Sequence, residues 1–376
     1  MSTPSLAPHL SRADVARVRL ASLLLDTAAD PVRTAVGIVD HFLAMQAQDA
    51  PGVAWSLGLR TGHTERATAS ALEGRDVVRT WPMRGTLHLI PSRDAKWMLD
   101  LMGGKALAGA ARRREFLGLP EDVAHKAVDV LADLVADADG PVARKDCLAA
   151  LDEAGVSTQG QRGYHLLWFA SQLGHLAGGP PQGKEQTFVS LDSWAPEHRS
   201  PSHDEALALV AAAYVRGHGP VTDREMARWT GLGLRECRAG LGEAAASFDD
   251  GIVEVETDAG PAWVSAVELD PPQVAPTRLL PGFDEFMLGY SVEERAVDPA
   301  HHAAVVPGNN GVFKPTVIDD GRVVALWSRR LMATSVRVEV TPLATLTDAA
   351  KSRIADAAQE YAAYVERPLE VRWVER

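Results

Sequence analysis

The chain has 376 residues, which is too long for one typical core and favours two to four modules. Apolar residues make up 46% and charged residues 23%, an ordinary globular composition that indicates no disorder beyond the first few residues. The formal net charge of -12 argues against nucleic acid as a partner, since phosphate neutralisation needs Lys and Arg, although a basic concave surface can coexist with acidic outer faces.

Cysteine usage and the N-terminal segment bear on the compartment. The two cysteines, Cys147 and Cys237, lie far apart in predicted helices, which is typical of a reducing cytoplasm and predicts neither disulfides nor a zinc site. Charged residues interrupt the apolar ones in residues 1–26, so neither a secretory signal nor a membrane span fits. We therefore expect a cytoplasmic protein without a membrane partner.

The first segment is predicted to be mainly helical. Apolar spacing indicates a helix over residues 13–26, and a second helix through "PVRTAVGIVDHFLAMQAQD" that the following Pro-Gly pair ends. Gln46 and Gln48 therefore fall on its last turn or in the loop just after. The short apolar stretch "AWSLGLRT" and the helix "ERATASALEGRDVVR" come next, and the alternation from Thr86 to Ile90 predicts a strand.

Two later segments repeat one another. Each begins Gly-Pro-Val and continues as a short helix, a turn with Gly and a second helix; in the second copy Thr222 and Glu225 have the capping-box spacing. A helix precedes each copy ("EDVAHKAVDVLADLVADA" and "HDEALALVAAAYVRGH") and a possible β-ribbon follows it ("QTFVSLDSW" and "GIVEVETDAGPAWVSA"). This order is that of a winged helix, and the N-terminal segment has it with a longer middle.

The last part of the chain is predicted to be rich in strands. Asp320-Gly321 between "PTVI" and "RVVALW" is a strong hairpin signal, and a helix "TDAAKSRIADAAQEYAAYVE" and a strand "LEVRWVE" close the chain. The fold class is thus α+β. The predicted regions are three winged-helix units at 1–118, 119–200 and 201–270, and a β-rich domain at 271–376.

Chemistry-bearing motifs are few. The sequence has no GxSxG, Walker A or HExxH, and no GxGxxG after a strand, so several enzyme classes are unsupported and no cofactor or metal is expected. The adjacent pairs Asp284-Glu285 and His301-His302 suggest acid-base or metal chemistry, but neighbouring side chains diverge on a helix or strand. The cluster "ARRRE" reads as a DNA contact or as a solvated helix face.

Gln46 and Gln48 allow two interpretations. An amide does not titrate in the usable range, so neither is an ordinary general base. Two amides can hold a water molecule and offer carbonyl oxygens to a developing positive charge. The simpler alternative is a pair of helix-end amides that satisfy backbone groups.

Four segments together resemble a known family. "LAMQAQDAPGVAWSLGLRT", "VVRTWPMRGTLHLI", "LLPGFDEFMLGY" and "PGNNGVFKPTVIDDGRVVALW" are similar to the signature segments of the bacterial winged-helix DNA glycosylases of the AlkZ type, the azinomycin self-resistance family. The resemblance implies three tandem winged helices and a C-terminal β-barrel that form a C-shaped clamp on DNA. It also implies a catalytic Gln-apolar-Gln motif, matched here by Gln46 and Gln48, and a β-hairpin that probes the minor groove.

The implied activity is removal of alkylated bases such as N7-alkylguanine from double-stranded DNA by a monofunctional glycosylase, and in some members the unhooking of interstrand crosslinks. The second Gln places the sequence with the self-resistance branch, because a sister branch has Asp there. We expect a monomer. Residues in or beside the matching segments are candidate DNA contacts, namely Arg84, His88, Lys314, Trp327, Arg329 and Arg330; His88 alternatively packs within its strand, and Arg84 alternatively anchors a carboxylate.

Two other functions stay open on sequence alone. A winged-helix regulator without catalysis would bind a defined undamaged sequence. A hydrolase of small molecules would bring Asp284, Glu285 and His301 together in a closed pocket, with Gln46 and Gln48 buried and bonded to backbone.

Overall fold

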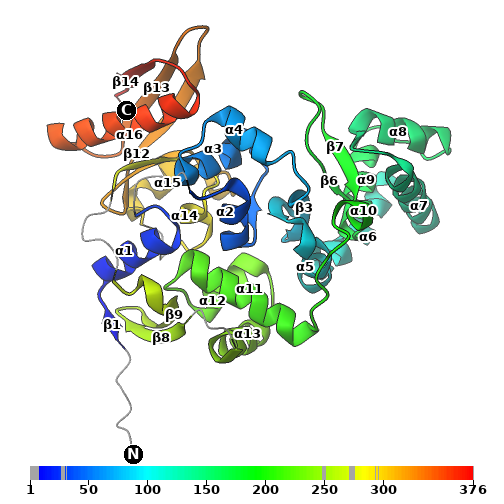
Figure 1. Cartoon of the computed structure of the whole chain (residues 1–376), viewed down its shortest axis with the longest axis horizontal. Helices are drawn as coiled ribbons and strands as arrows, with labels where there is room; N and C mark the ends of the chain where they lie inside the picture. Colours follow the sequence, from blue (N-terminus) through cyan, green and yellow to red (C-terminus); the bar gives the residue numbers. More distant parts are fainter. Residues whose placement is uncertain are drawn as a thin grey trace, which may run out of the picture.

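The computed structural model describes residues 8–26, 30, 32–247, 251–270, 276–292, 294 and 296–375. Its described strands form three sheets, of three, six and five strands (Figure 1). The class is therefore mixed α+β, as predicted. In the described part of the chain no helix is long and apolar enough to cross a membrane.

The first unit has the order helix, strand, helix, helix and hairpin. Its elements are α2 (Ala35–Phe42), β2 (Met45–Gln46), α3 (Ala50–Thr61), α4 (Glu65–Ala71), β3 (Val77–Met83) and β4 (Thr86–Pro91). The predicted helix through Asp49 was too long, because Leu43 takes a φ of 62° and ends α2. Pro51 sits in the first turn of α3 instead of ending a helix, a position where its missing N–H costs nothing.

The second unit repeats this order and shares a sheet with the first. After α5 (Ala95–Met102) and α6 (Gly104–Leu117) come α7 (Glu121–Asp137), β5 (Val142–Ala143), α8 (Arg144–Glu153), α9 (Arg162–Gln172), β6 (Leu176–Gly178), β7 (Thr187–Ser190) and α10 (Leu191–Trp194). Strand β3 pairs with β6 through Arg79 and Gly178, which joins both hairpins in the order β2-β4-β3-β6-β7-β5. The unit keeps a separate apolar core around Leu131, Leu151 and Leu166.

The third unit consists of α11 (His203–His218), α12 (Asp223–Thr230), α13 (Leu234–Ser247), β8 (Ile252–Thr257) and β9 (Gly260–Ser265). The predicted capping box of Thr222 and Glu225 at α12 is confirmed. The N-terminal elements β1 (His9–Leu10) and α1 (Arg12–Ser22), expected in the first unit, belong here instead: β1 pairs in parallel with β8, and Val18 shares a small core with Val255.

The C-terminal part holds an open sheet and not the barrel that we expected. Its elements are β10 (Arg278–Leu280), α14 (Glu285–Leu288), α15 (His302–Val305), β11 (Thr316–Asp319), β12 (Arg322–Leu331), β13 (Val336–Pro342), α16 (Asp348–Tyr364) and β14 (Leu369–Trp373). Among the described strands, the order β10-β11-β12-β13-β14 leaves β10 and β14 unjoined, so the described sheet does not close. Asp320 and Gly321 have φ of 49° and 71°, which confirms the predicted hairpin turn.

These regions meet around the first unit. Figure 1 shows the second unit at one end, the C-terminal sheet with α16 at the other, and the first unit between them. The largest core cluster joins residues of the first, third and C-terminal regions, among them Trp55, Tyr214 and Trp327. Four short 3-10 turns complete the described elements: Ser92–Asp94, Ala266–Glu268, Pro299–His301 and Pro307–Asn309.

Candidate active site

The two glutamines of the Gln-apolar-Gln motif differ in their surroundings. Gln46 lies on strand β2, 8% exposed, and its Oε1 is buried without a hydrogen-bond partner. Gln48 is exposed in the bend before α3. Between them, the Ala47 N–H donates to the Leu87 carbonyl at 2.8 Å, so backbone groups are paired without the side chains. The simpler interpretation required the side-chain oxygen of Gln46 to accept a hydrogen bond from a backbone group. Gln46 Oε1 accepts none, so that interpretation does not hold for Gln46.

A row of polar side chains crosses the sheet beside Gln46. Residue Gln46 pairs with His88 on β4, and His88 pairs with Thr80 on β3, so the three side chains share one face. The three are buried, and Thr80 Oγ1, like Gln46 Oε1, has no partner. Because a buried polar atom without a partner costs free energy, two of them in one row are candidates to contact a ligand or a water molecule.

His88 is held as a neutral base. Its Nδ1 lies 2.7 Å from the Thr86 carbonyl, which only accepts, so Nδ1 carries the proton and Nε2 a lone pair. Burial, and then the positive charge of Arg84, lower the pKa of His88 to about 4, against smaller opposing effects from Glu285 and the Thr86 bond. At 1% exposure His88 is not a surface contact for DNA, which corrects that expectation.

Arg84 lies in the turn of the β3–β4 hairpin. Arg84 and Gly85 have φ of 54° and 70°, the two-residue turn that suits a twisted hairpin. The Arg84 side chain is exposed, yet protein atoms crowd the guanidinium and lower its pKa, while Glu285 acts against them. No ion pair between Arg84 and a carboxylate is present among the described residues, so Arg84 stays a predicted DNA contact.

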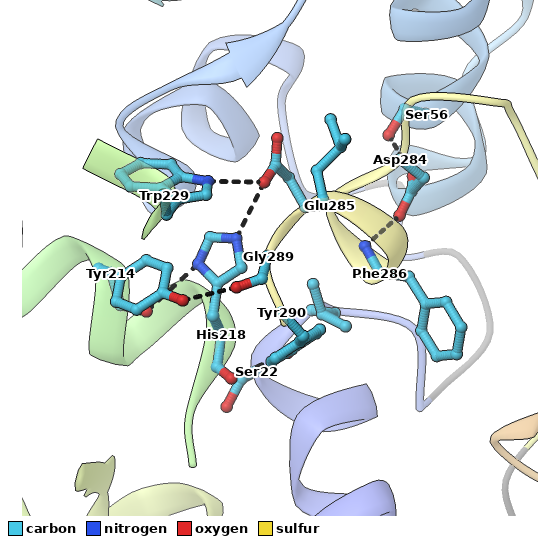
Figure 2. A network of polar contacts seen from close by, with 12 residues as sticks. Ser22, Ser56, Tyr214, His218, Trp229, Asp284, Glu285, Phe286, Gly289 and Tyr290 are labelled. Carbon is cyan, nitrogen blue, oxygen red and sulfur yellow. Dashed lines mark hydrogen bonds and ion pairs between the residues drawn. The ribbon is translucent and has the colours of Figure 1, made fainter. Parts of the chain in front are cut away.

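The segment "LLPGFDEFMLGY" sends its two carboxylates to opposite sides of α14 (Figure 2). Asp284 is fully enclosed: Ser56 donates to it at 2.6 Å, and Arg60 makes two bonds of 2.9 and 3.0 Å. Burial alone would raise the pKa of Asp284, but the Arg60 guanidinium and these bonds outweigh it and lower the pKa. Asp284 therefore ties α3 to the C-terminal part.

Glu285 faces the third unit. Its Oε2 accepts from His218 Nε2 at 3.1 Å and from Trp229 Nε1 at 3.0 Å. Burial raises the pKa of Glu285, whereas the His218 bond and charge, the Trp229 bond and the charge of His88 together lower it, so the carboxylate is ionised. The other ring nitrogen of His218 lies 3.2 Å from the Tyr214 carbonyl, so both ring nitrogens face acceptors (Figure 2).

Gly289 is needed where this segment passes His218. A Cβ there would lie 2.4 Å from His218 Cδ2 and 2.8 Å from the Glu285 carbonyl. We expect Gly289→Ala to lower the free energy of unfolding by about 1 to 3 kcal/mol, the usual result of overpacking. Urea unfolding measures it, with Gly242→Ala as the control because nothing lies within 4 Å of a Cβ there. Equal stability of the two variants would contradict the prediction.

The C-terminal contacts expected from the sequence fall into two groups. Trp327 is 3% exposed and its Nε1 donates to the Leu280 carbonyl at 2.8 Å, so the ring packs in the core and is not free to contact DNA, a second correction. Lys314 and Arg330 are exposed, and the Arg329 guanidinium lies 5.7 Å above the Tyr361 ring.

The small-molecule hydrolase that we considered finds no support in the geometry. Asp284 and Glu285 diverge, and His301 lies in a separate 3-10 turn. Both cysteines are buried free thiols, and burial raises the pKa of Cys147 to about 12 and of Cys237 to about 11. Within the described part of the chain, no three His, Cys, Asp or Glu side chains form a metal-binding group.

Comparison with known proteins decides the family. The model of the "DNA glycosylase AlkZ-like" family matches residues 39–364. The chain belongs to the AlkZ-like DNA glycosylase family. It is thus a DNA glycosylase, a hydrolase of N-glycosyl bonds, and the regulator without catalysis is not favoured. An "Interstrand DNA cross-link repair glycosylase" from Streptomyces sahachiroi is 28% identical over 316 residues, which are 78% of this chain and 82% of that protein.

A solved structure of the Streptomyces sahachiroi DNA glycosylase AlkZ has the same fold, with a TM-score of 0.78 at 22% identity. The alignment covers 97% of this chain and all of that one. Sequence patterns alone did not identify His218 and Trp229 as partners of Glu285. The Gly-Pro-Val repeat located the unit that carries them, but only the folded chain shows that they face Glu285.

Proposed function

We propose that this AlkZ-like glycosylase hydrolyses the bond between deoxyribose and N7-alkylated guanine in double-stranded DNA, as a monofunctional enzyme. The observation that carries the proposal is the buried, unpartnered Oε1 of Gln46 on a sheet face that also holds neutral His88. Such an oxygen can stabilise positive charge, and positive charge is what develops on the sugar.

The chemistry of the lesion explains why amides suffice. An N7-alkylguanine already carries a positive charge, so it is a good leaving group without protonation by an enzyme acid. The remaining barrier is an oxocarbenium-like sugar and the placement of water beneath it. Gln46 and Gln48 together stabilise the cation and position the water, Gln48 from the exposed edge. No side chain needs to form a covalent bond with the sugar.

DNA binding is assigned to the three repeated units and the C-terminal sheet. We propose that the units are winged helices and that they hold the duplex as a clamp, with Arg84, Lys314, Arg329 and Arg330 on phosphates. The related glycosylase from Streptomyces sahachiroi is named for crosslink repair, which supports unhooking of interstrand crosslinks as a second activity of this chain. The shared sheet of the first two units supports a rigid arrangement.

The deciding experiment is excision from duplex DNA that carries one N7-methylguanine. We expect the protein to produce abasic sites, seen as strand breaks after alkali, and the double variant Gln46→Ala, Gln48→Ala to produce none above background. Binding of both proteins to the same duplex is compared in parallel. Cleavage by the wild type no higher than by the double variant would refute the proposed function.

A further inference from the structure

Hydrolysis leaves a proton that the two glutamines cannot take. When the bond from C1′ to N9 breaks, its electron pair neutralises the cationic base, and the attacking water loses a proton as its oxygen bonds to C1′. An amide does not accept that proton in the usable pH range. A further group must remove it, or it must pass to bulk solvent.

We propose that His88 is this group: its Nε2 accepts the proton of the water that Gln46 holds, and His88 is a catalytic residue. The inference rests on the proposed function. The positive charge that enters with the alkylated base is then carried by the protonated imidazole. The imidazole releases the proton to solvent after the product departs.

The strand register brings His88 to Gln46. Because Ala47 and Leu87 are a hydrogen-bonded pair, the next pair along the ladder, Gln46 and His88, is of the non-bonded type. Side chains are closest in such pairs, with Cβ atoms about 4.5 to 5.5 Å apart. One water molecule can therefore bridge the unpartnered Gln46 Oε1 and the His88 ring.

The protonation state of His88 suits this role. The Thr86 carbonyl fixes the proton on Nδ1, so Nε2 keeps its lone pair and is the atom that can accept a proton. A pKa of about 4 makes the free imidazole a weak base, but water that attacks a sugar cation is strongly acidic, so a weak base suffices.

Fixed charges around His88 stabilise the product of proton transfer. The ionised Glu285, oriented by His218 and Trp229, acts on the His88 ring and favours its charged form. Arg84, in the β3–β4 turn, has the opposite effect. Both of these bonds end on Oε2 of Glu285 and hold the carboxylate in place.

The first test removes the base and supplies it from solution. We expect His88→Gly to lower the single-turnover rate of N7-methylguanine excision about 100-fold, the scale of general base catalysis. Added imidazole should raise the excision rate of His88→Gly at least about tenfold. This increase should be proportional to the concentration of neutral imidazole, because only the neutral form accepts a proton. The control is Gln46→Ala, which imidazole should not rescue. Rescue of both variants to the same degree, or of neither, would overturn the assignment.

The second test avoids the risk that a glycine in β4 unfolds the hairpin. His88→Asn keeps a donor for the Thr86 carbonyl but offers no ring nitrogen as acceptor. We expect a similar loss of rate with unchanged DNA affinity and melting temperature. An excision rate equal to that of the wild type would refute the inference.

A pH profile separates proton transfer from a structural role. The wild-type rate should fall only as the pH drops toward about 4, where His88 becomes charged. Arg84→Gln removes a cation that lowers the pKa of His88, so the acid limb should move to higher pH; an unmoved limb would count against His88. A wild type that excises no N7-methylguanine would instead refute the proposed function, and with it this inference.

Discussion

Replacing Gln46 with alanine is expected to lower the single-turnover rate of N7-methylguanine excision about 100- to 1000-fold, the loss seen when one preorganised group that stabilises a transition-state charge is removed. The Oε1 of Gln46 is already buried and unpartnered, so no hydrogen bond to it has to break when the sugar becomes cationic. DNA affinity should change little, because Gln46 is 8% exposed.

Gln172 offers a matched control for this variant. It is also a buried glutamine with an unpartnered Oε1, but its Nε2 donates to the Trp81 carbonyl between the first and second units. Gln172→Ala should therefore lower stability and leave the chemical step intact in the molecules that stay folded. If the two variants lose excision to the same degree after correction for the folded fraction, Gln46 has no special part in the chemistry.

Replacing Arg60 with methionine is expected to lower the free energy of unfolding by about 3 to 5 kcal/mol, because it leaves the buried carboxylate of Asp284 without its partner. Both side chains are 0% exposed, and Arg60 also donates to the carbonyls of Leu23 and Ser56. The double variant Arg60→Met, Asp284→Asn should recover part of this loss. Urea unfolding followed with several probes measures the free energy of unfolding of both variants.

An exposed pair provides the comparison for Arg60. Arg353 lies 2.6 Å from Asp319, but its side chain is 52% exposed, so Arg353→Met should lower the stability far less than Arg60→Met does. The pH dependence has a definite sign: the folded-state pKa of Asp284 is lowered, so its contribution is present above the unfolded pKa of about 3.9 and is lost as the pH falls through the folded value. Equal losses from Arg60→Met and Arg353→Met would contradict the assigned role.

Local patterns predicted much of the fold. The helix His203–His218, the capping box at Thr222 and the turn at Asp320-Gly321 follow from periodicity, capping and turn chemistry, and the structure confirms them. The segment around Gln46 was harder. A buried strand of two residues carries no periodic signal, so the preceding helix was extended across it, and the Pro-Gly pair read as a stop is the first turn of α3.

Long-range contacts account for the rest. The sequence singled out Gln46, Gln48 and His88, but burial decided that His88 faces the interior, and no local rule brings Glu285 to His218. Trp327 was expected at a groove because basic residues flank it. The alternation along β12 places it on the covered face of the sheet, with Ala325.

The parallel pairing of β1 with β8 sets an order for biosynthesis. His9 lies opposite Glu256 and Leu10 opposite Thr257, so the N-terminal strand has no partner until more than two thirds of the chain has been made. Hairpins of the first and second units need only local partners and can form early, whereas pairing of such sequence separation is slow. The hairpins of the first and second units can thus form before the third unit takes up the N-terminal strand.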